Sequence, residues 1–220
     1  WLSPLGVFCL IFTTFSSLGI SIIFTLINYF LIVVAVLIFH AFFTYSLLLA
    51  SLAKINPLRF FIKMKETMLF AFSTSSSSAT MPITLKTVEE KLGVNKSISS
   101  FCIPLGTTIN MDGTAIMQGV ATVFIAQVYQ VDLSMMEYLM VIITATLASI
   151  GTAGVPGVGL IMLAMVLQQV GLPVEGIALI IGVDRLLDML RTAVNVSGDA
   201  TISCIVANSE NQLSRRDLNS

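Results

Sequence analysis

The sequence predicts an all-α integral membrane protein with four spanning helices and two re-entrant helical hairpins. Hydrophobic residues make up 56% of the 220 residues, charged residues make up 10%, and the mean hydropathy is +0.95. A soluble domain carries roughly 25% charged residues. Charges gather in short segments between long apolar stretches, two of which are interrupted by polar or glycine-rich runs. These observations exclude a water-soluble domain, a disordered chain and a nucleic-acid-binding surface.

The first 53 residues contain no Asp, Glu, Lys or Arg. A spanning helix needs about 20 apolar residues, so residues 1–53 are long enough for two transmembrane spans. Pro4, Ser16 and Gly19 interrupt the beginning of this stretch. We therefore expect a short first span and a second span over residues 22–53.

Residues 54–210 are predicted to form one transport core that contains two broken segments. Residues 67–85 carry a Ser/Thr run in their middle, and residues 138–172 are interrupted by the glycine-rich run 151–159. Irregular backbone at membrane depth is tolerated only where protein buries it or where it lines a watery cavity. Both segments are therefore expected to be re-entrant hairpins. They alternate with spans at about 97–128 and 176–208.

The distribution of basic residues predicts the orientation. With both hairpins re-entrant, the predicted loops 54–66 and 86–96 and the tail 211–220 face one side, and they hold all nine Lys and Arg residues outside the last span. The segments 132–137 and 175 face the other side and hold none. Because basic residues accumulate in cytoplasmic segments, we expect a cytoplasmic C-terminus.

Metal and nucleophile signals are weak. His40 is the only histidine, and Cys9, Cys102 and Cys204 match no metal-binding spacing. No nucleophile has a histidine beside it in the sequence. We expect no zinc site and no enzyme.

A polar stripe runs along the last predicted span. Asp184, Asp188, Arg191, Asn195 and Asp199 follow one another at steps of four, three, four and four residues. Such steps place side chains on one face of an α-helix, whereas Arg185 lies off that face. Each charge costs roughly 3 kcal/mol at the centre of a span. This face must therefore contact protein, an ion or a ligand.

Two interpretations of the stripe remain open. Asp184 and Asp188 could clamp Arg191 in a purely structural ladder of ion pairs. That ladder leaves Asp199 and Asp112 without a cation, and buried carboxylates of this kind are expected to bind one. The oxygen-rich neighbourhood of Asp112 favours a hard ion such as sodium; it is made of Thr107, Thr108, Asn110 and free carbonyl groups.

Four motifs give a resemblance to a known family. They are SSSATMP at 76–82, NMDGT at 110–114, GTAGVPG at 151–157 and DMLRTAVNVSGD at 188–199. With these motifs the chain resembles the glutamate transporter family of dicarboxylate/amino acid:cation symporters. The similarity runs over about residues 4–210 and corresponds to the C-terminal half of the family: spans five and six, hairpin one, span seven, hairpin two and span eight.

The resemblance implies an elevator-type secondary symporter. It would couple the inward movement of sodium ions to the uptake of aspartate or glutamate across the inner or plasma membrane. The full-length parent is expected to be a homotrimer in the lipid bilayer. Three alternatives remain: a proton-coupled or C4-dicarboxylate carrier, an anion channel or substrate-gated receptor, and a partial chain that binds substrate without transporting it.

The resemblance also implies roles for individual residues. Arg191, helped by Thr114, would hold the side-chain carboxylate of the substrate, Asp188 its α-ammonium group and Asn195 its α-carboxylate. The two hairpins would close over the substrate, and Thr192 shares the face of Asp188. The remaining substrate residues implied are Ser76, Ser77, Ser78, Val155 and Gly159.

Three sodium sites are implied in the same way. The first consists of Asp199 with carbonyl groups of Gly106, Asn110 and Asn195. The second consists of carbonyl groups of Ser149, Ile150 and Thr152 with Thr108 and Met111. The third includes Asp112 and Asn110, and its other ligands belong to a span of the family that has no counterpart here.

The chain departs from the family pattern at three positions. Many relatives have an arginine at the position of Ser75 or at that of Met189. Potassium-coupled animal members have a glutamate at the position of Gln118, so no potassium counter-transport is expected.

Overall fold

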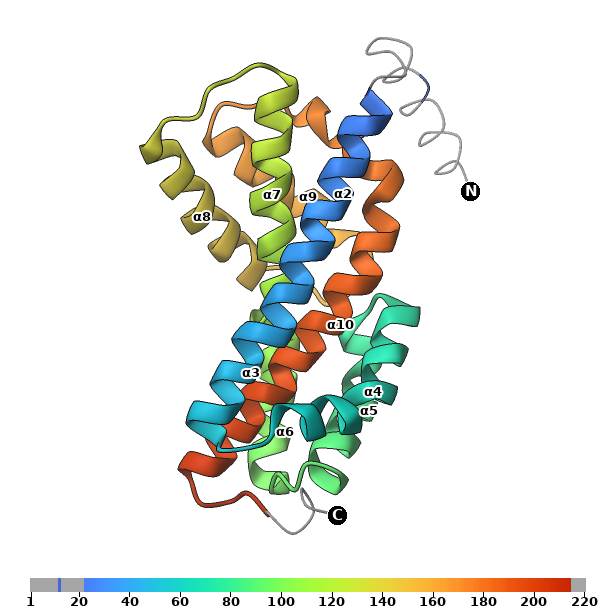
Figure 1. Ribbon diagram of the computed structural model, residues 1–220, viewed down its shortest axis with the longest axis vertical. Helices are drawn as coiled ribbons and strands as arrows, with labels where there is room; N and C mark the ends of the chain where they lie inside the picture. The colour runs from blue at the N-terminus through green and yellow to red at the C-terminus, as the bar shows by residue number, and fades with distance from the viewer. Residues whose placement is uncertain (1–11, 13–21, 215–220) are drawn as a thin grey trace.

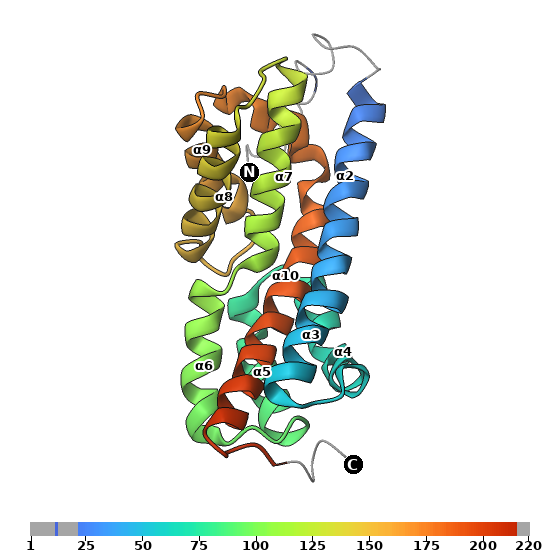
Figure 2. The same cartoon turned by 60° about the vertical axis from the view of Figure 1, so that its left-hand side comes forward.

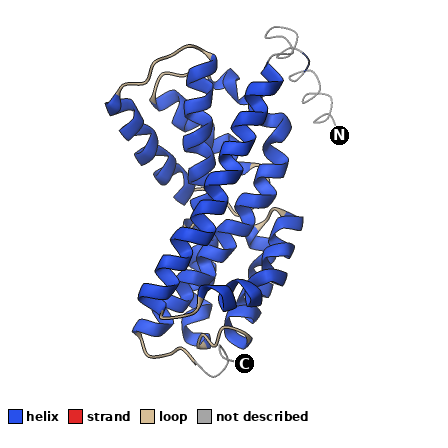
Figure 3. Ribbon diagram, viewed as in Figure 1, coloured by secondary structure: helices blue, strands red, loops and turns tan. Residues whose placement is uncertain are grey.

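The computed structural model describes residue 12 and residues 22–214, and every regular element in them is a helix (Figure 3). The all-α prediction is confirmed. The predicted first span, Cys9 and most of the tail lie outside the described residues. Within the described part, one continuous helical stretch, Phe24–Ala53, has the length and apolar composition needed to cross a membrane.

Two long helical stretches run side by side along the molecule (Figures 1 and 2). The first consists of α2 (Ile22–Phe39), a π-helical turn η1 (His40–Thr44), α3 (Tyr45–Leu48) and a second π-helical turn η2 (Leu49–Ala53). The second is α10 (Ile177–Ser209), whose 33 residues make it about 50 Å long.

Two groups of shorter helices pack against this pair, one at each end (Figures 1 and 2). The group near the C-terminus contains α4 (Pro57–Thr74), α5 (Ser77–Glu90) and α6 (Lys96–Ile109). The opposite group contains α7 (Asp112–Val128), α8 (Met135–Ile150) and α9 (Val158–Gln169), which the 3₁₀ turn η3 (Val174–Gly176) connects to α10.

Local sequence signals set the helix starts. The Asn56 side chain accepts a hydrogen bond from the Leu58 backbone, and Pro57 occupies the first helical position. Proline is favoured there because its missing N–H has no helical partner in any case. Most of the segment 54–66, which was expected to be a loop, is therefore helical. Ser134 and Glu137 begin α8 with a reciprocal capping box.

The tips of the α4–α5 and α8–α9 hairpins meet midway along the molecule. Ser75 adopts a left-handed conformation (φ 51°) between α4 and α5, and Gly157 does so (φ 81°) just before α9. Ser76 Oγ donates a hydrogen bond of 2.8 Å to the Gly154 carbonyl oxygen, and the Ser78 N–H donates one of 3.1 Å to the same oxygen. One carbonyl group thus joins the two tips.

The segment 97–128, predicted as one span, contains two helices with a break between Ile109 and Asp112. Polar groups of the break, one side chain and one backbone N–H, bond to α10. Asn110 Nδ2 donates to Asp199 Oδ1 (2.8 Å), and the Gly113 N–H donates to Asn195 Oδ1 (2.7 Å). The break is stable because α10 supplies the hydrogen-bond partners that a helix end lacks.

Apolar side chains form two cores, one in each helix group. Helix α10 contributes to both, through residues such as Leu187 in one and Cys204 in the other. Between them, residues 191–201 of α10 are all buried, although they include Arg191, Asn195 and Asp199. Polar side chains therefore occupy the centre of the molecule, where the hairpin tips and the α6–α7 break also lie.

Candidate functional site

A small polar cavity lies at this central level. It encloses about 10 Å³, which is space for about one water molecule. Both hairpin tips, the α6–α7 break and α10 contribute to its wall. The lining residues are Ser75, Ser77, Met111, Thr114, Thr152, Ala153, Gly154, Val155, Gly159, Asp188, Arg191, Thr192 and Asn195.

Arg191 is the central charged group of this cavity and is 2% exposed. Its Nε donates to Asp188 Oδ1 (2.9 Å), and its Nη1 donates to Asp184 Oδ1 (3.1 Å). A guanidinium group has five N–H donors, so these two bonds leave further donors available. Its Nη2 faces the tip of the second hairpin, since a Cβ atom added at Gly159 would lie 3.0 Å from it.

The second hairpin is tied to the helices behind it by its backbone. The Gly157 N–H donates to Asp188 Oδ2 (3.0 Å), and Gln118 Nε2 donates to the Gly159 carbonyl oxygen (3.3 Å). Asp188 therefore contacts Arg191 through one carboxylate oxygen and the hairpin through the other. A movement of this tip would change the environment of both charges.

Uncharged polar groups complete the wall of the cavity. Asn195 Nδ2 approaches Met111 Sδ (3.2 Å) and Thr114 Oγ1 (3.5 Å), and Thr192 Oγ1 donates to the Asp188 carbonyl oxygen (2.7 Å). The structure brings eight of the ten predicted substrate residues to the cavity: Arg191, Asp188, Asn195, Thr192, Thr114, Ser77, Val155 and Gly159. The other two, Ser76 and Ser78, bond to Gly154 instead.

The residues predicted for the first sodium site converge around Asp199, which is 2% exposed. Its carboxylate accepts the Asn110 amide hydrogen bond, and the same amide donates to the Asn195 carbonyl oxygen (3.3 Å). Gly106 lies directly against this carboxylate, because an added Cβ atom would come within 2.5 Å of Asp199 Oδ1. Within residues 22–214, Asp199 forms no ion pair.

The residues predicted for the second sodium site are only partly brought together. Met111 and Thr152 line the central cavity, and Ser149 is buried at the end of α8. Thr108 and Ile150 are exposed, and the Thr108 hydroxyl donates to the Leu105 carbonyl oxygen.

The expectation that Asp112 has no side-chain partner is wrong. Its Oδ2 accepts a hydrogen bond from the Tyr45 hydroxyl (2.9 Å) and lies 3.0 Å from His40 Nε2. Both partners lie on the first long helical stretch: His40 is the first residue of the π-helical turn η1, and Tyr45 directly follows its last residue. The signal for His40 was present in the sequence, since a lone ionisable residue within an apolar stretch is by default a functional candidate.

Other residues of the site gave weaker signals. Asp184 pairs with Arg191 together with Asp188, which are the contacts that the ladder interpretation expected. Ser75 and Gly154 line the cavity, and the Ser75 hydroxyl is buried without a hydrogen-bond partner in the described residues. Their position depends on how the two tips meet, which no local pattern reveals.

Comparison with known families decides which class of protein carries this site. Residues 1–209 match the model of the sodium:dicarboxylate symporter family. The chain belongs to the sodium:dicarboxylate symporter family. This is a family of transporters and not of enzymes, and the chain is therefore part of a membrane protein.

Several characterised relatives are similar to the chain. It is 48% identical over 182 residues to excitatory amino acid transporter 3 of Mus musculus, covering 82% of this chain and 35% of that protein. It is 43% identical over 222 residues to excitatory amino acid transporter 1 of Mus musculus, covering 99% and 41%. An excitatory amino acid transporter of Caenorhabditis elegans is 43% identical over 208 residues, covering 94% and 41%. The chain thus spans about two fifths of the length of these relatives.

Proposed function

We propose that this chain forms the substrate- and sodium-binding core of a secondary active symporter that takes up aspartate or glutamate. The observation that carries the proposal is the central cavity, where a buried arginine, a carboxylate and an amide converge between two hairpin tips. The family match and the relatives named as excitatory amino acid transporters support the substrate class. Sodium is the coupling ion in this proposal.

Each polar group of the cavity suits one part of an acidic amino acid. The planar guanidinium of Arg191 suits a side-chain carboxylate, with Thr114 as a second donor. Asp188 complements an α-ammonium group, and Asn195 complements an α-carboxylate. A cavity of about 10 Å³ cannot contain an amino acid, so the Gly157–Asp188 hydrogen bond has to break when substrate enters. The α8–α9 tip then acts as the gate.

The oxygen-rich cluster around Asp199 suits sodium, a hard cation that prefers oxygen ligands. Asp199 would supply the charge, and carbonyl groups of Gly106, Asn110 and Asn195 would supply neutral ligands. The Asn110 amide donates to one oxygen of this carboxylate, and the carboxylate has further lone pairs that an ion could use. Bound sodium would hold the α6–α7 break against α10 and would thereby preorganise Asn195 for substrate.

We extend the proposal to the arrangement in the membrane. Residues 22–53, the α6–α7 pair and α10 cross the bilayer. The α4–α5 and α8–α9 hairpins enter from opposite sides and meet at its middle, and the C-terminus is cytoplasmic. Paired hairpins of this kind place a transporter's binding site near the bilayer midplane. In the full-length parent, this core would move as an elevator within a homotrimer.

Binding of radiolabelled aspartate to the purified chain at increasing sodium concentration tests the proposal. We expect saturable binding that requires sodium and that Asp199→Ala abolishes. Glu210→Ala is the matched control, because Glu210 follows the last residue of α10 and is exposed. Equal sodium titration curves for the two variants would refute the role of Asp199.

The two contacts of Arg191 favour a second candidate, in which the Asp184–Arg191–Asp188 cluster is only a structural ladder. The ladder predicts that aspartate does not bind, or that it binds with the same affinity when Arg191 is replaced. A C4-dicarboxylate carrier would instead prefer succinate to aspartate, and a proton-coupled carrier would bind without sodium. A chain that binds but does not transport would give no aspartate uptake into liposomes.

A further inference from the structure

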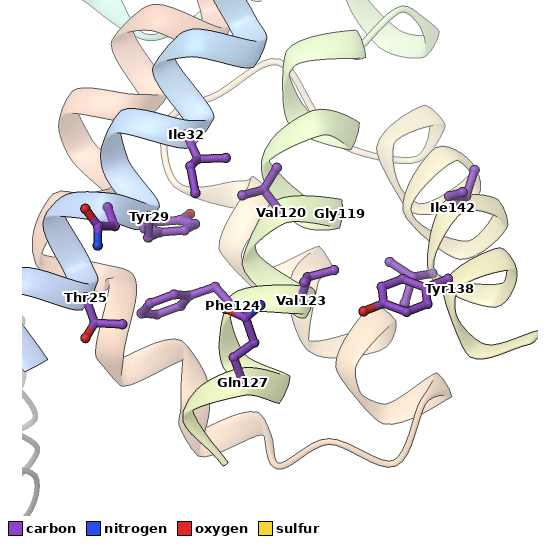
Figure 4. Close-up of a pocket in the computed structure, with 12 residues that line it drawn as sticks. Thr25, Tyr29, Ile32, Gly119, Val120, Val123, Phe124, Gln127, Tyr138 and Ile142 are labelled. Carbon is purple, nitrogen blue, oxygen red and sulfur yellow. The ribbon is translucent and has the colours of Figure 1, made fainter. Parts of the chain in front are cut away.

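The Tyr29 hydroxyl is buried inside the protein without a hydrogen-bond partner among the described residues. Tyr29 lies on α2 and is 2% exposed. Its ring packs against Phe124 of α7, with the two ring centroids 4.9 Å apart (Figure 4). A buried polar atom without a partner is rare in folded proteins, because it destabilises the state in which it occurs. This hydroxyl therefore indicates a second state in which it has a partner.

Two charged groups of α10 lie within electrostatic range of the hydroxyl. They are Asp184 and Arg191, and the charge of Asp184 acts on it more strongly. Helix α2 packs along α10, and Tyr29 belongs to the same apolar core as Ile180 and Leu187, which lie about one turn before and after Asp184. Arginine has no acceptor atom. Of the two charged groups, only Asp184 can therefore accept a hydrogen bond from the hydroxyl.

The Asp184 carboxylate has unused capacity to accept hydrogen bonds. It is 5% exposed, and its Oδ1 accepts one bond from Arg191 Nη1 (3.1 Å). Within residues 22–214 no other hydrogen bond reaches this carboxylate. Since a carboxylate offers about four lone pairs, it could accept the Tyr29 O–H as well. In the structure described here it bonds to Arg191 alone.

Binding of an acidic amino acid would change what Arg191 has to compensate. In the empty site the guanidinium group pairs with two carboxylates, those of Asp184 and Asp188. In the function proposed above, the side-chain carboxylate of the substrate joins them, and the substrate ammonium group compensates Asp188. Asp184 then shares Arg191 with another anion and is the buried carboxylate that most needs a further donor.

We propose that Tyr29 is a positioning residue for acidic substrates: its hydroxyl donates to Asp184 when a substrate carboxylate pairs with Arg191. The inference rests on the proposed function. The hydroxyl is unsatisfied in the empty site and satisfied in the occupied one, so the new bond favours binding. A neutral amino acid brings no side-chain carboxylate and leaves the Asp184–Arg191 pair as it is. Tyr29 thus contributes to substrate preference although it does not line the central cavity.

Tyr29→Phe, which removes only the hydroxyl, tests the proposal in the purified full chain. In competition against radiolabelled aspartate, we expect about tenfold lower affinity for aspartate and unchanged affinity for alanine, because one bond to a charged acceptor is lost. The stability of the empty protein should not fall, since the hydroxyl has no partner there. Tyr138→Phe is the matched control, because Tyr138 is exposed. Equal losses of affinity for aspartate and alanine would indicate a merely structural tyrosine and would refute the proposal.

A double-mutant cycle identifies the partner of the hydroxyl. In an Asp184→Leu background, Tyr29→Phe should no longer lower the aspartate affinity, whereas in a Gln118→Met background its full effect should remain. Gln118 is the alternative acceptor, because its Oε1 is also buried without a partner in the described part of the chain. An effect of Tyr29→Phe that persists without Asp184, or that disappears without Gln118, would overturn the assignment.

A second measurement does not depend on aspartate binding. The double replacement of Asp188 by Asn and Arg191 by Gln frees Asp184 from its partner and leaves the net charge of the cluster unchanged. In that background Tyr29→Phe should raise the unfolding equilibrium constant about tenfold, whereas in the original chain it should not raise it. This difference would support the exchange of partners even if aspartate failed to bind. Equal effects of Tyr29→Phe in the two backgrounds would refute it even if aspartate bound.

Discussion

Replacing Gly106 with alanine should weaken sodium binding without adding or removing any charge. Gly106 lies in α6, where the helix passes the Asp199 carboxylate without a side chain between them. An alanine Cβ atom would lie 2.5 Å from Asp199 Oδ1 and 2.9 Å from its Cγ. Ordinary contacts of a Cβ atom begin at 3.4 Å, so one of the two groups has to move.

The size of the effect follows from this distance. The carboxylate has to shift by about 0.9 Å, whereas a functional site tolerates displacements of about 0.5 Å. Overpacking of a tight contact costs typically 1–3 kcal/mol, and 1.4 kcal/mol corresponds to a factor of ten in an equilibrium constant. We therefore expect the sodium concentration for half-maximal aspartate binding to rise by about tenfold or more.

The assay is aspartate binding at a series of sodium concentrations, with Gly119→Ala as the control. Gly119 is also a helical glycine, but its added Cβ atom has no neighbour within 4 Å. Its sodium curve should be unchanged, because alanine favours the helix and meets nothing. Overlapping curves for Gly106→Ala and Gly119→Ala would show that the carboxylate of Asp199 does not set the sodium affinity.

Three further predictions follow from individual contacts. Arg191→Cys should lower the ratio of aspartate affinity to alanine or serine affinity by about a hundredfold in a competition panel, because the charge that requires a side-chain carboxylate is gone. A retained preference for aspartate would favour the structural ladder. Tyr45→Phe removes a hydrogen bond to Asp112 and should lower the free energy of unfolding in detergent by about 1.5 kcal/mol. An unchanged free energy of unfolding would show that His40 alone is enough to stabilise the buried Asp112 carboxylate. Hydrogen bonds from the Ser134 hydroxyl and N–H lower the pKa of Glu137. The ionised Glu137 therefore stabilises the fold above its ordinary pKa, and this contribution is lost as the pH falls through the lowered pKa. Ser134→Ala should raise the pKa of Glu137 in a carboxyl NMR titration, and an unmoved titration would contradict the capping box.

The stripe on α10 was predictable because helical steps of three and four residues fix which side chains share a face. Asp184, Asp188 and Arg191 are accordingly buried together, while Arg185 is exposed. The polar and glycine-rich runs likewise indicated where helices would stop. Ser75 and Gly157 take left-handed conformations at those places.

Other features depend on contacts between distant segments and could not be read from any one of them. The α6–α7 break is stabilised by α10 through Asn195 and Asp199, so the pattern of residues 97–128 alone resembles one span. Asp112 meets His40 across 72 residues of sequence.

The contact between the hairpin tips has a mechanical consequence. Two donors from one hairpin, Ser76 Oγ and the Ser78 N–H, share a single backbone oxygen of the other. Separating the tips has to break both bonds, because both donors share that one acceptor. A backbone oxygen cannot be removed by mutation, but the Ser76 hydroxyl can. A side chain at position 154 would also push the tips apart, because a Cβ atom there would lie 2.9 Å from Ser78 Oγ. The contact between the tips thus depends on one side-chain donor, Ser76, and on the absence of a side chain at residue 154.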